Sequence, residues 1–169
     1  EINKNDIFFA IKGKKKDGNL FIAEAFKNGA SLVITDKLKN NKNCLRVKNT
    51  LKFLTHASSI LRENLSCKVI AITGSSGKTS LKELIGRSLK KDYSVTYSPR
   101  SFNNNFGVPV SLFNLRKSDD FGIFEIGMNK KGEINYLSKI IKPDVGIITN
   151  ISYAHIKNFK NIKEIALAK

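Results

Sequence analysis

Tryptophan is absent from this 169-residue sequence, and cysteine, histidine and methionine are nearly so, with two, two and one copies. Cys44 and Cys67 stand in unlike contexts, and no second pair of cysteines completes a zinc site. We therefore expect both cysteines to be free thiols that pack as small apolar side chains in a reducing cytoplasm.

Long hydrophobic runs are missing as well. No apolar stretch approaches the roughly 20 residues of a membrane-spanning helix, so we expect no insertion into a membrane. No charged and then apolar leader with a small-residue cleavage site is present, which favours a cytoplasmic protein. The first residue is Glu1 rather than methionine, so we expect further sequence upstream.

Acidic residues number 14 against 30 lysines and arginines, which gives a net charge of +16. A clustered excess would indicate nucleic-acid binding, because these side chains release counterions from phosphates. The excess is instead spread evenly, with 13 basic and 6 acidic residues (+7) in residues 1–66, and 17 and 8 (+9) in residues 67–169. Lysine and asparagine are abundant and arginine is scarce, so we interpret the charge as a solvated basic surface that also favours anionic substrates, not as a nucleic-acid site.

Hydrophobic periodicity predicts strands that alternate with helices along the whole chain. The predicted strands are residues 7–11, 31–35, 45–47, 68–73, 93–97, 121–126 and 145–150. The predicted helices are residues 19–28, 50–64, 79–91, 108–115 and 132–141, and a last one from 161 to the final residue. This alternation implies parallel sheets and an α/β fold. We place a boundary near Ser66, which gives a small N-terminal α/β domain (1–66) and a second domain with a mostly parallel sheet (67–169).

Residues 71–80 (AITGSSGKTS) stand directly between a predicted strand and a predicted helix. Glycines allow successive backbone N–H groups to point at phosphate oxygens, and the following helix directs its positive end to the same place. Lys78 would reach the β- and γ-phosphates of ATP, and the hydroxyl of Thr79 would hold Mg²⁺. The general phosphate-loop pattern has glycine where this chain has Ile72, and the extra glycine is Gly74. The alternative is an ordinary glycine-rich turn.

The shifted glycine makes residues 73–79 (TGSSGKT) resemble the phosphate loop of the Mur ligase family and of its relatives, the folylpolyglutamate synthetases. Residues 101–109 (SFNNNFGVP) and 125–134 (EIGMNKKGEI) are similar to segments of the Mur ligases that add D-alanyl-D-alanine to a peptidoglycan precursor. Residues 6–18 (DIFFAIKGKKKDG) and 28–30 (NGA) look like the N-terminal, UDP-sugar-binding domain of that family. The resemblance spans nearly the whole chain and implies a P-loop-type central domain that is truncated at its C-terminal side.

The resemblance implies a set of functional residues. Those for ATP are Thr73, Gly74, Ser75, Ser76, Gly77, Lys78, Thr79 and Ser80; those for the substrates are Asp17, Gly18, Asn103 and Asn104; those for catalysis are Lys78, Glu125, His155 and Lys169, and those for metal are Thr79, Glu125, His155 and Lys169.

Physical arguments that do not depend on the resemblance also bear on several of these residues. Glu125 ends a predicted buried strand at the same sheet edge as the phosphate loop, where a carboxylate can ligate Mg²⁺; a salt bridge to a lysine is the alternative. His155 follows the strand that ends at Asn150, although a lone histidine is more often structural than a ligand. Asn103 and Asn104 offer amide donors and acceptors to a peptide or phosphate, although asparagine is also favoured in turns.

Lys169 lies fourteen residues beyond His155, at the spacing at which the family has a lysine that carries a carbamate formed with CO₂. A carbamate converts an ammonium into a carboxylate on a long arm, which can reach a second Mg²⁺. Its formation requires a neutral amine, so the lysine must be partly desolvated or held among other cations. The alternative is a solvated lysine on a helix.

The resemblance implies a cytoplasmic, monomeric ligase that uses ATP and Mg²⁺, at two sites, to join D-alanyl-D-alanine to UDP-N-acetylmuramoyl-tripeptide through an acyl phosphate. We expect this chain to lack the family's C-terminal domain and to be inactive alone. Two other classes of protein remain open: a different P-loop enzyme such as a nucleotide kinase, which would need arginines in a lid, and a non-catalytic basic binding module.

Overall fold

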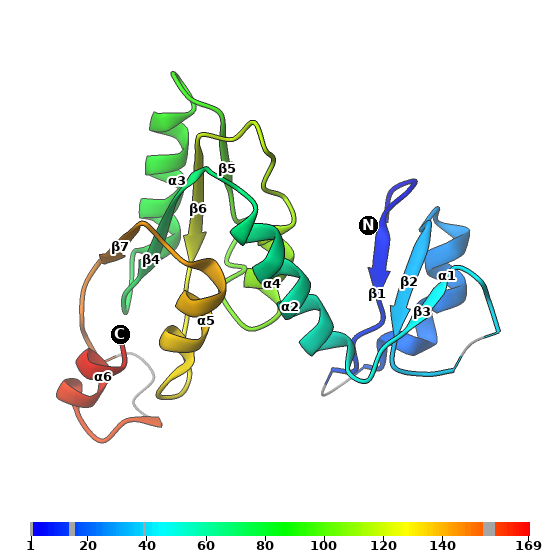
Figure 1. The fold of residues 1–169 in the computed structure, drawn as a ribbon. Coiled ribbons are helices and arrows are strands. Elements are labelled where there is room, and N and C mark those ends of the chain that lie inside the picture. Colours follow the sequence, from blue (N-terminus) through cyan, green and yellow to red (C-terminus); the bar gives the residue numbers. More distant parts are fainter. Residues whose placement is uncertain (1, 14–15, 39, 154–157) are drawn as a thin grey trace. The chain divides into compact units, whose positions relative to one another are not determined.

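The computed structural model describes residues 2–13, 16–38, 40–153 and 158–169 (Figure 1). The chain forms two compact units, Glu1–His56 and Ala57–Lys169. The division therefore falls inside helix α2 (Thr50–Glu63), whereas the sequence places the boundary near Ser66. Within the described part of the chain, none of the helices is long and apolar enough to cross a membrane.

The first unit is built on a three-stranded parallel sheet with the order β1-β2-β3. Its strands are β1 (Ile7–Phe9), β2 (Leu32–Thr35) and β3 (Cys44–Arg46). The helix predicted at residues 19–28 is divided into a 3-10 helix (Gly18–Phe21) and α1 (Ile22–Lys27), and the carboxylate of Asp17 caps the first of them by accepting the N–H of Asn19. Ile22 and Phe26 of α1 pack against Val33 to form this unit's small core.

The second unit contains a four-stranded sheet in which every described pairing is parallel. Its strands are β4 (Lys68–Thr73), β5 (Val95–Tyr97), β6 (Phe121–Glu125) and β7 (Val145–Ile148), in the order β5-β6-β4-β7. Its helices are α3 (Lys78–Leu89), α4 (Gly107–Leu112), α5 (Glu133–Ile141) and α6 (Ile162–Ala168), together with the end of α2. The predicted α/β fold is confirmed.

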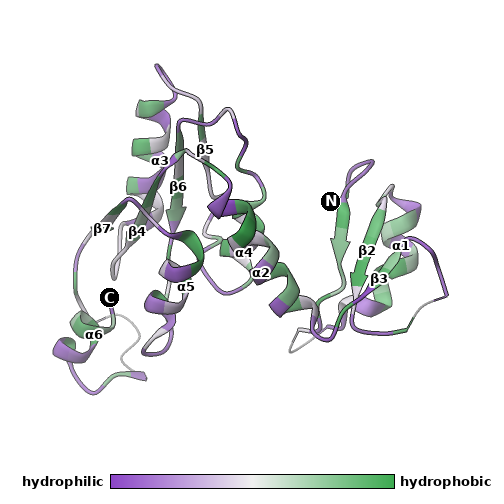
Figure 2. Ribbon diagram, viewed as in Figure 1, coloured by the Kyte–Doolittle hydropathy of each residue, from purple (hydrophilic) through white to green (hydrophobic). Residues whose placement is uncertain are grey.

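Alternation along β4 sends hydrophobic side chains to both faces of this sheet, and Figure 2 shows its strands as largely hydrophobic. Val69 and Ala71 belong to the core that α4, α5 and α6 cover. Ile70 and Ile72 belong to the core that α3 covers, together with Leu81 and Ile85 of that helix. A buried sheet with helices on both faces accounts for the near-continuous apolar run of β4.

The strand order places the candidate site. β4 lies between β6 and β7, and all of these strands run in the same direction, so the loops that follow Thr73, Glu125 and Ile148 leave the sheet at one edge. In open α/β sheets, ligands bind at such carboxyl ends, where the chain departs to opposite sides of a central strand.

Arg62 at the end of α2 bonds to the residues that precede β4 and β7, at the amino-terminal edge of the sheet in the second unit. Its guanidinium donates to the carbonyl oxygens of Ile141, Leu65 and Lys142 and to the carboxylate of Asp144, at 2.9 to 3.3 Å. The Arg62 side chain is 10% exposed, so these acceptors depend on it in place of water.

We expect Arg62→Ala to lower the free energy of unfolding by about 3 kcal/mol, because three carbonyl oxygens lose a buried donor and Asp144 loses one of its partners. Lys68→Ala is the matched control, since Lys68 contacts the same Asp144 from a position where its side chain is 70% exposed. The control should lose less than about 1 kcal/mol. Denaturant titration of both variants measures the difference, and equal losses would contradict this assignment.

Candidate active site

The loop between β4 and α3 has the backbone geometry of a phosphate loop. Gly74 has a φ of 144° and Gly77 a φ of 75°, both in the region that favours glycine. Gly77 is the N-cap of α3, so the helix begins at Lys78 and directs its positive end at the loop. The ammonium of Lys78 folds back to donate to the carbonyl oxygen of Gly74, at 2.9 Å.

The segment that follows β7 supports this loop, a role that sequence reasoning did not assign. The side-chain oxygen of Asn150 accepts the N–H groups of Ser75 and Ser76, at 3.2 and 3.0 Å. The hydroxyl of Thr149 donates to the carbonyl oxygen of Ser76 at 2.6 Å. A carboxamide oxygen here satisfies N–H groups of the kind that a phosphate oxygen would use. The signal available in the sequence was the pair Thr149-Asn150 at the carboxyl end of the strand predicted over residues 145–150.

Glu125, at the end of β6, meets the start of α3. Phe121, Ile123 and Glu125 alternate onto the sheet face that α3 covers, which explains why this carboxylate reaches that helix. Its side chain is buried, with an exposure of 1%. The hydroxyl of Thr79 donates to Glu125 Oε2 at 2.6 Å, and the side-chain amide of Asn103 donates to Oε1 at 2.7 Å.

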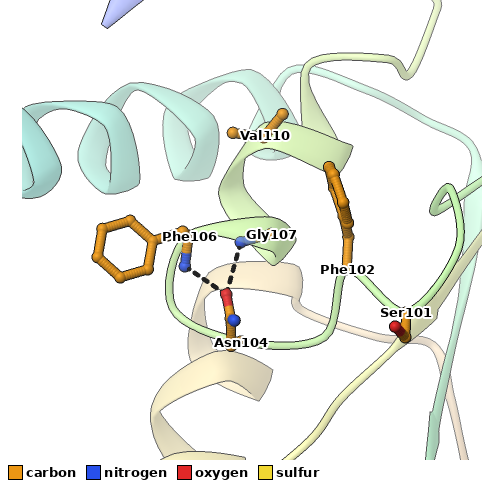
Figure 3. Close-up of a pocket in the computed structure, with 6 residues that line it drawn as sticks. All are labelled: Ser101, Phe102, Asn104, Phe106, Gly107 and Val110. Carbon is orange, nitrogen blue, oxygen red and sulfur yellow. Dashed lines mark hydrogen bonds between the residues drawn. The ribbon is translucent and has the colours of Figure 1, made fainter. Parts of the chain in front are cut away.

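Asn104 lies on the same loop as Asn103, but its side chain accepts hydrogen bonds from backbone N–H groups a few residues further along the chain. Its side-chain oxygen accepts the N–H groups of Phe106 and Gly107, at 3.0 and 2.9 Å, ahead of α4 (Figure 3). This is the turn-forming behaviour that asparagine shows in many loops. Asn104 also lines a pocket of about 230 Å³, whose other lining residues are Ser101, Phe102, Phe106, Gly107 and Val110 (Figure 3). The two neighbouring asparagines therefore differ: Asn103 faces Glu125, and Asn104 shapes the loop.

Lys169 follows α6 and lies within electrostatic reach of Lys78. Burial, and to a smaller extent the positive charge of Lys78, lower the pKa of Lys169 from 10.5 to about 8. The unfolded chain therefore binds more protons between these two values, so this group's contribution to the free energy of unfolding rises as the pH rises from about 8 to 10.5.

Other predicted site residues lie apart from this centre or outside what can be described. His155 falls outside the described residues. Ser80 is exposed on α3. Among the described residues, no group of three or more His, Cys, Asp or Glu side chains is placed to hold a metal ion.

Asp17 and Gly18 belong to the first unit. The carboxylate of Asp17 accepts from the Asn19 amide and from the ammonium of Lys37, and these hydrogen bonds lower the pKa of Asp17 to about 2. A Cβ on Gly18 would lie 2.6 Å from the backbone nitrogen of Ile11, so only glycine fits this turn. The structure thus gives both residues a role in the loop's shape.

Comparison with known proteins assigns the family. Residues 72–169 match the model of the Mur ligase middle domain. The chain belongs to the Mur ligase family. Membership confirms the resemblance read from the phosphate loop and sets aside the nucleotide-kinase and basic-module alternatives.

Individual relatives agree with that assignment. The chain is 39% identical to the UDP-N-acetylmuramoyl-tripeptide–D-alanyl-D-alanine ligase of Rickettsia prowazekii, with all of this chain and 38% of the relative aligned. The crystal structure of MurF from Acinetobacter baumannii superposes with a TM-score of 0.90 at 36% identity, covering all of this chain and 38% of that one. MurF of Thermotoga maritima, solved in complex with ADP, superposes with a TM-score of 0.86 at 34% identity, covering 99% of this chain and 40% of that one. The chain thus spans about two fifths of the length of these proteins.

Gly74 and Gly77 have different reasons to be glycine, which provides a test of the loop geometry. A Cβ at position 74 would lie 1.8 Å from Oγ1 of Thr149, whereas a Cβ at position 77 would meet nothing within 4 Å. We expect Gly77→Ala to cost about 1 kcal/mol of unfolding free energy from its φ alone, and Gly74→Ala about 3 kcal/mol.

Thermal or denaturant unfolding of both variants measures these costs. The double variant Gly74→Ala/Thr149→Ala should lose less than the sum of its single changes, because the clashing hydroxyl is gone. Additive losses, or equal losses at positions 74 and 77, would show that Thr149 does not close over the loop.

Proposed function

We propose that this chain carries the ATP-binding centre and the UDP-sugar-binding region of an ATP-dependent ligase that joins D-alanyl-D-alanine to UDP-N-acetylmuramoyl-tripeptide in peptidoglycan precursor synthesis. The observation that carries the proposal is the phosphate loop between β4 and α3 with Thr79 bonded to the buried carboxylate of Glu125. Two ligases of that name align with the whole chain, at 39% and 32% sequence identity, and support the proposal.

In the proposed reaction, the terminal carboxylate of the tripeptide attacks the γ-phosphorus of ATP, which releases ADP and gives an acyl phosphate. The amine of D-alanyl-D-alanine then attacks the acyl carbon, and inorganic phosphate and a proton leave. The chain's part is to position and neutralise phosphate charge. Lys78 exchanges its contact with the Gly74 carbonyl oxygen for the phosphates, and the N–H groups at the start of α3 face the same oxygens.

Glu125 at the end of β6 and Thr79 at the start of α3 fit a magnesium ion. Glu125 is a carboxylate with 1% exposure, and a charge so deeply buried calls for a cation or strong hydrogen bonds. Glu125 and Thr79 supply a carboxylate and a hydroxyl oxygen, which are hard ligands of the kind that Mg²⁺ takes together with substrate phosphates. When bound, the ion would supply positive charge against the transferring phosphoryl group.

Lys169 and His155 complete the proposal as ligands of a second ion. Because burial and Lys78 lower the pKa of Lys169 to about 8, a larger fraction of its amine is neutral near that pH than for an ordinary lysine. The neutral nitrogen attacks CO₂, a proton leaves, and the side chain becomes a carbamate whose two oxygens replace a positive charge near Lys78. The Coulomb repulsion that lowers the pKa of Lys169 becomes an attraction after this change.

Substrate contacts outside the phosphate loop form the last part of the proposal. We place the UDP-sugar at the Asp17–Gly18 loop and the muramoyl peptide at Asn103 and Asn104. The pocket of about 230 Å³ beside Asn104 offers Phe102 and Val110 as apolar contacts (Figure 3). A crystal structure of the full-length protein with the UDP-muramoyl-peptide bound tests both placements, and substrate bound elsewhere would reject them.

We expect Lys78→Ala in the full-length protein to lower kcat for ligation by at least about 10³-fold, because the variant loses a point charge on the transferring phosphoryl group. Release of ADP that depends on D-alanyl-D-alanine measures turnover. Binding of the UDP-muramoyl-peptide, followed by calorimetry, should be unchanged, since that site is assigned elsewhere. Normal turnover in Lys78→Ala would contradict the proposed function.

We expect Lys169 to titrate near pH 8 and to take up ¹³CO₂, which gives a carbamate signal in the ¹³C NMR spectrum. Lys78→Met should raise the pKa of Lys169 but leave it below 10.5, because burial is the larger cause of the shift. Lys163→Met, on the exposed side of α6, is the control and should leave the signal unchanged. A fully active protein with no carbamate signal would overturn this part of the proposal.

A further inference from the structure

A lysine that the proposed chemistry does not use is the largest fully buried side chain of the described chain. Lys82 of α3 has an exposure of 0%. Its ammonium donates to the backbone carbonyl oxygens of Ser98, at 2.6 Å, and Arg100, and lies 3.2 Å from the carboxylate of Glu83. A buried ammonium is costly unless it is hydrogen-bonded and paired, so these contacts fix where the segment after β5 can lie.

That segment adopts a conformation that needs such support. Arg100 has a φ of 48°, which an L-residue adopts at a cost of roughly 1–2 kcal/mol. The Arg100 carbonyl oxygen is one of the two that Lys82 holds. The lysine therefore stabilises the chain at the point where its backbone is strained.

The same segment continues directly into the residue that contacts the buried carboxylate. Asn103 donates its side-chain amide to Glu125 at 2.7 Å, and its carbonyl oxygen accepts the N–H of Gly127 at 2.7 Å. A Cβ on Gly127 would lie 2.9 Å from the Asn103 side chain, so this contact is tight. A shift of the segment would thus be passed to Glu125.

Two residues of α3 reach this carboxylate by different routes. Thr79 bonds to Glu125 directly, at 2.6 Å. Lys82, one turn later on the same helix, reaches it through the Ser98–Asn103 segment. Residues spaced by three lie on one helical face, so α3 fixes both the hydroxyl and the amide that orient Glu125.

We propose that Lys82 is a positioning residue for the magnesium site, which holds the Ser98–Asn103 segment so that Asn103 orients the Glu125 carboxylate beside Thr79. The inference rests on the proposed function, because it assigns Glu125 and Thr79 to the metal. It adds a residue that neither touches the nucleotide nor binds the ion. Groups that orient metal ligands typically change metal affinity by about 10- to 100-fold when they are removed.

The experiment measures a fluorescent, non-hydrolysable ATP analogue binding to the full-length protein, over a range of Mg²⁺ concentrations and without Mg²⁺. Lys82→Met keeps the length and apolar stem of the side chain but removes the ammonium. We expect the Mg²⁺ concentration that gives half of the metal-dependent gain in affinity to rise at least about tenfold, while affinity without Mg²⁺ stays unchanged. Loss of folded structure alone would reduce both affinities together, so this split separates positioning from stability.

Two further variants sharpen the test. Lys90→Met is the matched control, because Lys90 lies on the surface after α3 and over the same Tyr97 ring as Lys82, and it should bind with the wild-type Mg²⁺ dependence. Lys82→Gln keeps amide donors for the carbonyl oxygens and so protects the fold; its Mg²⁺ requirement should fall between those of wild type and Lys82→Met. Combining Lys82→Met with Asn103→Ala should add little to Asn103→Ala alone, because the first change acts through the second residue.

The outcomes are distinct. A wild-type Mg²⁺ requirement in both Lys82 variants, or equal loss of the metal-free and metal-dependent affinities, would overturn the positioning role and leave the proposed function standing. Fully additive effects of Lys82→Met and Asn103→Ala would also overturn it. A wild-type protein that binds no Mg²⁺–nucleotide would reject the proposed function, and the inference with it.

Discussion

The buried carboxylate of Glu125 connects β6 of the second unit with α3 and with the segment after β5. It is 1% exposed, and a carboxylate so deeply buried is stable only where donors or cations are fixed around it. Thr79 and Asn103 supply those donors from two different elements, α3 and the segment after β5. The parallel order of β5, β6 and β4 brings these elements to one sheet edge. The hydrogen bonds that stabilise the buried carboxylate are therefore also the ones that assemble the candidate site.

Lysine accounts for most of the net charge of +16, yet the structure uses individual lysines in different ways. Lys78 donates to the carbonyl oxygen of Gly74 in the phosphate loop. Lys82 is fully buried and holds backbone carbonyl oxygens. Lys169 has its pKa lowered to about 8 by burial and by Lys78. Overall composition describes a basic surface, but burial and neighbours decide what each lysine can do.

Much of the fold was predictable, because local signals and the tertiary structure agree there. The apolar run of β4 and the glycines beside it predicted the strand, loop and helix that the structure contains. The same signals did not predict that the first helix starts as a 3-10 turn, because short 3-10 turns are frequent at helix ends and the hydrophobic periodicity does not distinguish them. The sequence places the boundary near Ser66, whereas the compact units divide inside α2, a helix that is continuous across the division.

The sequence by itself determined the family, the phosphate loop and the presence of Glu125 and Lys169, since these depend on residue types at fixed spacings along one chain. Only the tertiary structure decided that Asn103, and not Asn104, faces Glu125, and that Asn150 accepts from the phosphate loop. It alone revealed Lys82 as a buried residue, although pattern alone would place a lysine on the surface of α3. The physical reason is that burial and hydrogen-bond partners arise from segments up to 82 residues apart, whose contacts no local pattern encodes.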